Sequence, residues 1–219
     1  NLVGLAGSSA IITSCMRALL TFYGVEIPRP QLANLIRLVE TRELGIPAGL
    51  QDRVAQVYGG LTYMDFAEEL FRRQGYGRYE TLNVNLPPLY IAYRTDLSEG
   101  SEVLHSGLRE RFRCGDKEVL EAIKFWAELT DQARVVLESG DIALLDGIIN
   151  SNFDKRAAVC PISEGNMAMI ETAREAGASA KFTGSGGAII GTYKDDVMYE
   201  RLEAALRTLQ VKVFKPRLI

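Results

Sequence analysis

Two carboxylates, Glu40 and Asp52, lie on either side of a Gly-Ile-Pro-Ala-Gly segment in the stretch ETRELGIPAGLQDR. The surrounding pattern predicts Glu40 near the end of one helix and Asp52 in the first turn of the next, so the turn could bring both to one cavity. One carboxylate could then hold Mg²⁺, which prefers carboxylate and phosphate oxygens. The other could accept or orient a hydroxyl proton. The alternative is a solvated Glu at a helix end and an Asp favoured by the helix dipole.

Two glycine-rich segments could give these carboxylates a phosphate to act on. Gly4–Ala10 leads into an apolar run at helical spacing, and Lys181–Gly187 lies between two apolar strand candidates. Backbone N–H groups at a helix start bind anions, and Ser8 and Ser9 add hydroxyls that can reach a phosphate oxygen or a metal ion. Three glycines in four positions of the second segment favour close approach to a ligand, since a hairpin needs only one or two. A capping Gly-Ser turn and a plain hairpin stay open as alternatives.

The composition excludes several classes of function. The chain has 219 residues, 47% hydrophobic and 24% charged, which suits one large or two small globular domains. A net charge of −3 with scattered Lys and Arg gives no field for nucleic acid, and no apolar run approaches the roughly 20 residues of a membrane span. Three distant cysteines predict reduced thiols and a cytoplasmic location. A single histidine argues against a multi-histidine metal centre.

The positioning elements follow from hydrophobic periodicity and from glycine and proline breaks. Helices are predicted at about Ile11–Phe22, Pro28–Leu44, Leu50–Tyr58, Ala67–Arg73, Glu102–Arg113, Asp116–Ser139, Asp141–Ala158, Glu164–Ala176 and Asp196–Leu209. Extended segments are predicted at Leu61–Phe66, Tyr79–Asn85, Leu89–Tyr93, Ala180–Thr183, Ala188–Tyr193 and Val211–Lys215. Helices packed against mostly non-adjacent strands predict an α+β fold.

These segments, in this order, resemble the second and third motifs of the GHMP small-molecule kinases. GSSA at Gly7–Ala10 resembles the phosphate loop of that family, and Lys181–Gly187 resembles its C-terminal glycine segment. The stretch Ala48–Gly60, AGLQDRVAQVYGG, closely resembles the glucuronokinases within the family. The resemblance implies the GHMP kinase fold. Residues 1–85 would be the C-terminal portion of a ribosomal-S5-domain-2-like, ATP-binding N-terminal domain, and residues 86–219 a ferredoxin-like C-terminal domain.

The activity that this resemblance implies is ATP- and Mg²⁺-dependent phosphorylation of the anomeric hydroxyl of a sugar acid, D-glucuronate to D-glucuronate 1-phosphate. Asp52 would be the catalytic carboxylate, and Ser9 and Glu40 would hold the metal. The residues at the ATP phosphates would be Leu5, Gly7, Ser8, Ser9 and Ala10, and those at the substrate Gln51, Asp52, Arg53, Thr183, Gly184, Ser185, Gly186 and Gly187. Alternatives are another anomeric kinase, for heptose 7-phosphate, fucose or galactose, or a catalytically silent ligand-binding relative.

Arg53 carries a separate hypothesis about specificity. A uronate has a carboxylate, which an arginine can hold in a bidentate pair, and related kinases for neutral or phosphorylated sugars often have Gln after the aspartate. Arg53 would then help to select the acid. An ion pair with Asp52, or a charge on the helix surface, is the alternative.

The resemblance leaves two departures. Ala6 stands where most family members have Leu. The glycine segment begins four residues from Asn1, so the N-terminal part of the family's fold, which supplies its first motif, is expected to be a missing partner of this chain. Without it, the apolar face on which the first helix packs is expected to be exposed, and the fragment is expected to have poor stability.

Overall fold

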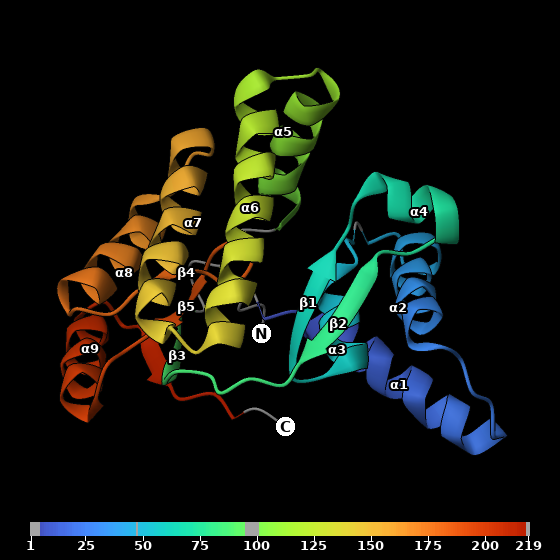
Figure 1. The fold of residues 1–219 in the computed structure, drawn as a ribbon, viewed down its shortest axis with the longest axis horizontal. Coiled ribbons are helices and arrows are strands. Elements are labelled where there is room, and N and C mark those ends of the chain that lie inside the picture. Colours follow the sequence, from blue (N-terminus) through green and yellow to red (C-terminus); the bar gives the residue numbers. More distant parts are fainter. Residues whose placement is uncertain (1–4, 47, 95–100, 218–219) are drawn as a thin grey trace. The chain divides into compact units, whose positions relative to one another are not determined.

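The computed structural model describes residues 5–46, 48–94 and 101–217, with no side-chain detail for residues 101–106. Contacts divide this part of the chain into two compact units (Figure 1). The first unit holds residues 6–83, and the second holds Leu5 with residues 84–217. Each unit has its own hydrophobic core and is described by itself.

The first unit packs helices and a two-stranded sheet around a small core. Its elements are α1 (Gly7–Tyr23), α2 (Arg29–Leu38), a π-helical turn (Val39–Glu43), α3 (Gln51–Tyr58), β1 (Leu61–Asp65), α4 (Glu68–Gln74) and β2 (Arg78–Leu82). The strands β1 and β2 are antiparallel. Leu32 and Ile36 on α2 meet Val54 and Val57 on α3. These residues recur three or four positions apart, so each helix turns one apolar face inward.

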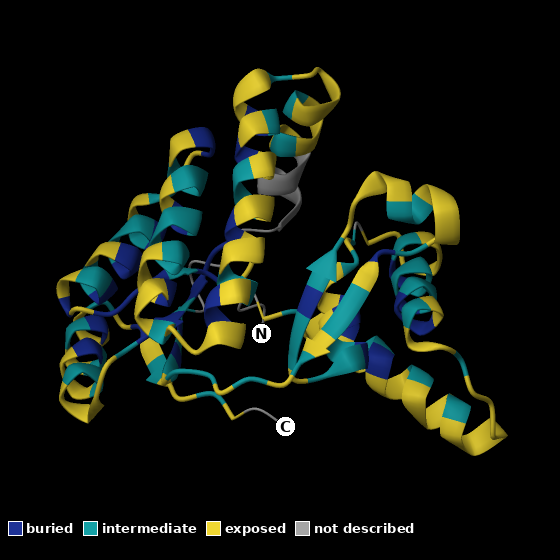
Figure 2. Ribbon diagram, in the orientation of Figure 1, coloured by how far each residue is buried: buried dark blue, intermediate teal, exposed yellow. Residues whose placement is uncertain are grey.

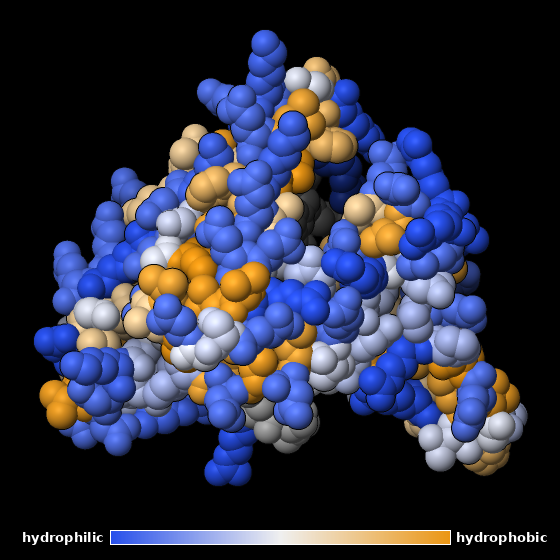
Figure 3. Space-filling model, in the orientation of Figure 1, coloured by the Kyte–Doolittle hydropathy of each residue, from blue (hydrophilic) through white to orange (hydrophobic). Residues whose placement is uncertain are grey.

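Helix α1 leaves much of its apolar surface uncovered within this unit. Only Ser9 and Thr13 of α1 are buried, and both are polar. The large apolar side chains Leu19, Phe22 and Tyr23 are exposed, with Phe22 at 81%. Figure 2 colours most of α1 as exposed, and Figure 3 shows hydrophobic side chains on the surface of this helix. Large apolar residues gathered on one exposed helix mark a surface that packs against something else.

The second unit covers one four-stranded sheet with helices. Its elements are β3 (Leu89–Tyr93), α5 (Ser101–Arg113), α6 (Lys117–Ser139), a 3₁₀ turn (Ile142–Leu144), α7 (Leu145–Val159), α8 (Glu164–Glu175), β4 (Lys181–Phe182), β5 (Ala188–Thr192), α9 (Asp196–Thr208) and β6 (Lys212–Phe214). The strand order is β4-β5-β3-β6, and all neighbours are antiparallel. This order and its helical crossovers are those of the ferredoxin-like fold, as expected.

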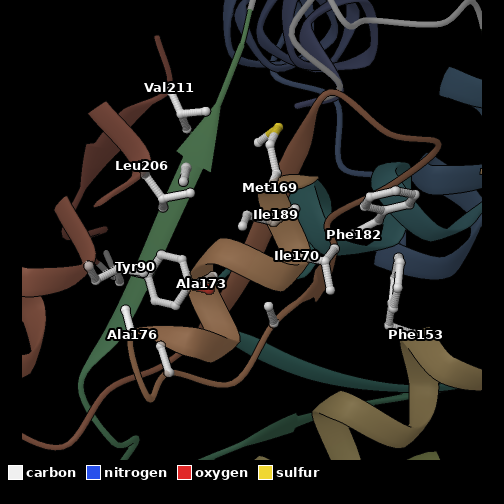
Figure 4. Packing of buried hydrophobic residues seen from close by; sticks show 14 residues of the cluster. Tyr90, Phe153, Met169, Ile170, Ala173, Ala176, Phe182, Ile189, Leu206 and Val211 are labelled. Atoms are coloured by element: carbon white, nitrogen blue, oxygen red, sulfur yellow. The ribbon is translucent and has the colours of Figure 1, made fainter. Parts of the chain in front are cut away.

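The core of the second unit fixes the β4–β5 hairpin. Met169 and Ile170 of α8 pack with Ile189 of β5, and the rings of Phe153 and Phe182 meet edge to face at 5.1 Å (Figure 4). The hydroxyl of Tyr90, a fully buried residue, donates to a backbone carbonyl of the same core. The segment that joins β4 to β5 is the glycine segment at residues 183–187, so the core sets both ends of that loop.

The α+β prediction is confirmed, and most predicted elements are present. One detail of the first helix was wrong, because α1 begins at Gly7 and not at Ile11. Ser8 and Ser9 therefore lie inside its first turn and do not cap it. Among the described helices, none combines the length and the apolar character that crossing a bilayer requires.

Candidate active site

The start of α1 presents unpaired backbone donors. Ala6, the residue before the helix, has the left-handed conformation (φ 54°, ψ 40°), and no side chain caps the helix. The first intrahelical bond runs from Ala10 N–H to the Ala6 carbonyl at 3.2 Å. The N–H groups of Gly7, Ser8 and Ser9 therefore have no acceptor within the helix, and α1 has no acidic residue in its first turn. Such a terminus binds anions.

A buried carboxylate lies beside this first turn. Ser8 Oγ donates to Glu40 Oε1 at 3.1 Å, and Glu40 is fully buried while Ser8 is exposed. Arg53 Nε donates to the other carboxylate oxygen, Oε2, at 2.5 Å, and its Nη2 contacts the same oxygen. Arg53 Nη1 lies 3.3 Å from Asp52 Oδ2. The predicted convergence of Glu40 and Asp52 thus occurs through Arg53, which is buried and is not a helix-surface charge.

Glu40 is held by an irregular helix end. It belongs to the π-helical turn Val39–Glu43, in which Leu44 N–H donates to the Val39 carbonyl at 3.1 Å. The Glu40 carbonyl accepts from Ile46 N–H at 2.8 Å. Single π turns in α-helices frequently lie at functional sites. Here the turn fixes the backbone of the residue that carries the buried carboxylate.

Ser9 has a different environment from Ser8. Its hydroxyl is buried, donates to the Ala6 carbonyl at 3.0 Å and accepts from Gln56 Nε2 at 2.9 Å. Gln56 also donates to the Ala6 carbonyl at 3.1 Å and accepts from Thr13 Oγ1 at 3.1 Å. Gln56 is not among the site residues predicted from the sequence, although its place one turn after Asp52 on α3 was a usable signal. Ser8, and not Ser9, contacts the carboxylate predicted to hold metal.

Asp52 is the accessible carboxylate of the cluster. It lies in the first turn of α3, and its side chain is 49% exposed. Among the described residues, nothing bonds its second oxygen, Oδ1. Its neighbour Gln51 is also exposed. The first unit therefore places a fixed, buried carboxylate and a partly free one around the uncapped start of α1.

The second unit holds the glycine segment from two helices. Arg156 on α7 donates through Nη1 to the Gly184 carbonyl at 2.8 Å and through Nη2 to the Ser185 carbonyl at 3.3 Å. Asn166 on α8, which is buried, accepts from Gly187 N–H at 2.8 Å. The sequence analysis named neither side chain. No local signal marks them, because each lies more than 20 residues from its partner.

Two cations lie near this segment. Burial lowers the pKa of the Arg156 guanidinium. Burial also lowers the pKa of the Lys181 ammonium, and the positive charge of Arg156 lowers it further. In the ion pairs found among the described residues, neither cation has a carboxylate partner. The surroundings of the segment are therefore positive.

The predicted site residues fall into two groups. The set that the structure gathers in the first unit is Gly7, Ser8, Ser9, Ala10, Glu40, Gln51, Asp52 and Arg53. The set that lies on the glycine segment of the second unit is Thr183, Gly184, Ser185, Gly186 and Gly187. Leu5 belongs to neither set; it is exposed and directly precedes the start of the first unit. No cluster of three His, Cys, Asp or Glu side chains suited to a metal ion occurs in the described part.

Known proteins match this chain in sequence and in fold. Residues 2–60 match the model of the GHMP kinases N terminal domain. The chain is 42% identical to glucuronokinase 1 of Arabidopsis thaliana over 193 residues, which cover 85% of this chain and 53% of that protein. It is 44% identical to the probable glucuronokinase 2 of the same plant over 195 residues, which cover 85% and 52%. The chain thus spans about half the length of these relatives.

Solved structures support the fold. The structure of L. major mevalonate kinase in complex with R-mevalonate superimposes with a TM-score of 0.74 at 17% identity, covering 98% of this chain and 67% of that one. At this identity the likeness concerns the fold alone. The family model over residues 2–60, the two plant relatives and the shared fold show that the chain is similar to the GHMP kinases in sequence and in fold.

Proposed function

We propose that the protein containing this chain is a sugar kinase that transfers the γ-phosphoryl group of ATP to the anomeric hydroxyl of D-glucuronate, giving D-glucuronate 1-phosphate. The observation that carries this proposal is the cluster of Ser8, Glu40, Arg53 and Asp52 at the uncapped start of α1. The plant relatives named glucuronokinase support the choice of substrate.

The cluster suits a phosphate bound with Mg²⁺. The unpaired N–H groups at the start of α1 would receive phosphate oxygens. Glu40 and a serine hydroxyl offer the hard oxygen ligands that Mg²⁺ prefers, and waters and phosphates usually supply the rest. Ser8 is our first choice for that serine because it touches Glu40, and Ser9 is the second because Gln56 already occupies its hydroxyl. The metal would supply neutralisation of phosphate charge.

Asp52 would act on the acceptor. Its Oδ1 is available to accept the proton of the anomeric hydroxyl, while Arg53 fixes Oδ2. The anomeric oxygen would form a bond to the γ-phosphorus, the bond from that phosphorus to the bridging oxygen would break, and ADP would leave. Because this chemistry depends mainly on positioning and charge, Asp52 serves as base or as orienting group.

Arg53 and the glycine segment would complete recognition of the sugar acid. Arg53 is engaged by both carboxylates, so any role in selecting the uronate would be shared with its structural one. The residues 183–187 would approach the substrate or the transferred phosphoryl group through their backbone.

We also propose that residues 1–85 belong to an N-terminal ATP-binding domain and residues 86–219 to a C-terminal domain.

A further part of the same protein would cover α1. The exposed Leu19, Phe22 and Tyr23 support this, as does the greater length of the plant relatives. Thermal unfolding of this chain alone and of the full-length protein would test the covering of α1. An equal unfolding midpoint for the two would count against it.

The unpaired Cys15, Cys114 and Cys160 fit a reducing, cytoplasmic setting.

A coupled assay of ADP release on the full-length protein, with a panel of sugars, tests the proposal. Turnover of D-glucuronate with ATP and Mg²⁺, lost in Asp52→Asn, is the expected result. Turnover of heptose 7-phosphate, fucose or galactose in its place would identify another anomeric kinase. Nucleotide binding by calorimetry without turnover of any sugar would identify a silent relative.

A further inference from the structure

Two side chains fix three successive peptide groups of the glycine segment. Arg156 donates to the carbonyls of Gly184 and Ser185 at 2.8 and 3.3 Å. Asn166 accepts from the N–H of Gly187 at 2.8 Å. The Arg156 guanidinium also lies over the Phe182 ring, 5.1 Å from its centre. The segment is therefore held from α7 and α8, and its peptide planes are set by side chains remote in sequence.

The orientation of two amide groups follows from these bonds. In a planar trans peptide the C=O and the N–H point in opposite directions, and the described residues contain no cis peptide. Because the carbonyls of Gly184 and Ser185 point at Arg156, the N–H groups of Ser185 and Gly186 point away from it. Neither N–H meets an acceptor among the residues that the structure describes. Consecutive unpaired N–H groups of this kind bind anions.

The charge of Arg156 is not compensated, in contrast to that of Arg174 on α8. Arg174 also stacks on a phenylalanine, Phe153, and donates to two backbone carbonyls, but it pairs with Asp154 at 2.7 Å. Arg156 makes no ion pair within the described ranges. A desolvated, unpaired guanidinium behind the loop adds to its attraction for an anion.

We infer that Arg156 is a positioning residue that aims the N–H groups of Ser185 and Gly186 at an oxyanion of the reactants. That oxyanion is the carboxylate of the acceptor or the phosphoryl group in transfer. The inference rests on the proposed function and names what the glycine segment binds. Arg156 acts through the loop, because its Nη1 and Nη2 each donate to one of the two carbonyls and its Nε is buried.

The test uses Arg156→Gln and Arg156→Lys in the full-length protein, with Arg174→Gln as the matched control. We expect Arg156→Gln to lower kcat/KM by about 100-fold, the loss typical of a misplaced oxyanion donor. Arg156→Lys should recover part of it, since an ammonium keeps the charge but not the two-pronged geometry. Arg174→Gln should lower the melting temperature comparably and leave kcat/KM nearly unchanged. Equal losses of activity in Arg156→Gln and Arg174→Gln would overturn the inference.

The kinetic constants identify the oxyanion. A raised KM for D-glucuronate with unchanged kcat indicates the acceptor carboxylate, and a lowered kcat with unchanged KM indicates the phosphoryl group. Calorimetric titration with D-glucuronate and with inorganic phosphate separates this inference from the proposed function. If the wild type turns over no sugar but Arg156→Gln loses affinity for either probe, only the proposed function fails. If the wild type phosphorylates D-glucuronate and Arg156→Gln matches it in turnover and probe affinity, only the inference fails.

Discussion

The two glycine-containing loops of this chain are organised in opposite ways. At the start of α1, side chains bond one another, Ser8 with Glu40 and Ser9 with Gln56, and one backbone carbonyl, that of Ala6, accepts from Ser9 and Gln56. In residues 183–187, side chains hold the backbone, because Arg156 and Asn166 bond three successive peptide groups of the loop. The first loop has a buried carboxylate balanced by a buried arginine, whereas the second has an arginine with no counter-charge within the described part.

This difference predicts how each loop responds to substitution. A site that works through side-chain oxygens should be sensitive to loss of a charge at constant shape. A site that works through amide groups should be sensitive to backbone conformation, whatever the side chain. Substitutions in the full-length protein can test that contrast.

The largest effect is expected from Glu40→Gln. The change keeps the shape of the side chain but leaves Arg53 buried beside a neutral partner, which should cost about 3 kcal/mol of unfolding free energy. Loss of the carboxylate should lower kcat/KM by on the order of 10³. Steady-state kinetics and urea unfolding would measure both. Glu43→Gln, on the exposed side of the same π turn, is the control. Equal activity of Glu40→Gln and Glu43→Gln would show that the first loop does not depend on the negative charge of Glu40.

A smaller loss is expected from Asp52→Asn. Removal of the group that accepts or orients the acceptor proton should lower kcat by about 100-fold. Stability should hardly change, because Asp52 is half exposed and its pair with Arg53 is worth less than about 1 kcal/mol. The matched change is Glu68→Gln, a carboxylate in the first turn of α4. A large fall in melting temperature for Asp52→Asn would show that its role is structural.

Gly186→Ala tests the second loop through its backbone. Gly186 has φ 142°, and an added Cβ would lie 3.1 Å from Asn166 Nδ2. The strain should lower the unfolding free energy by about 1–3 kcal/mol. It should also turn the Gly186 N–H away from its position in the loop, so kcat/KM should fall about tenfold. Gly147→Ala on α7 is the control, since nothing lies within 4 Å of its added Cβ. This control should be slightly more stable than wild type. If Gly186→Ala behaves like Gly147→Ala, the second loop does not work through its backbone.

The sequence predicted the elements well because their signals are local. Helical periodicity, together with glycine and proline breaks, identified α6, α8 and α9 to within a few residues. The strand order of the second unit came from the family resemblance, since no local pattern specifies which strands pair. Glu40 and Asp52 could be proposed as site residues from the sequence because they stand 12 positions apart around a turn.

The residues that hold the loops were not predictable in the same way. Gln56 lies 47 positions from Ser9, and Arg156 lies 28 positions from Gly184, so only the folded chain brings each pair together. A further miss concerned the helix start. The left-handed Ala6 begins α1 before the serines, and an alanine carries no sequence signal for that conformation.

The smallest effect, and the most direct comparison of the two units, is expected from Ala6→Gly. Ala6 (φ 54°) and Gln210 (φ 59°) are the non-glycine residues with positive φ in the described chain, one in each unit. Glycine removes a steric cost of about 1 kcal/mol but gains entropy in the unfolded state, so the net gain should be about 0.5 kcal/mol. The melting temperature should rise by about 1 °C, with Gln210→Gly as the control. A loss of turnover in Ala6→Gly alone would show that the strained alanine, which fixes Ser9 and Gln56 through its carbonyl, is part of how the first loop works.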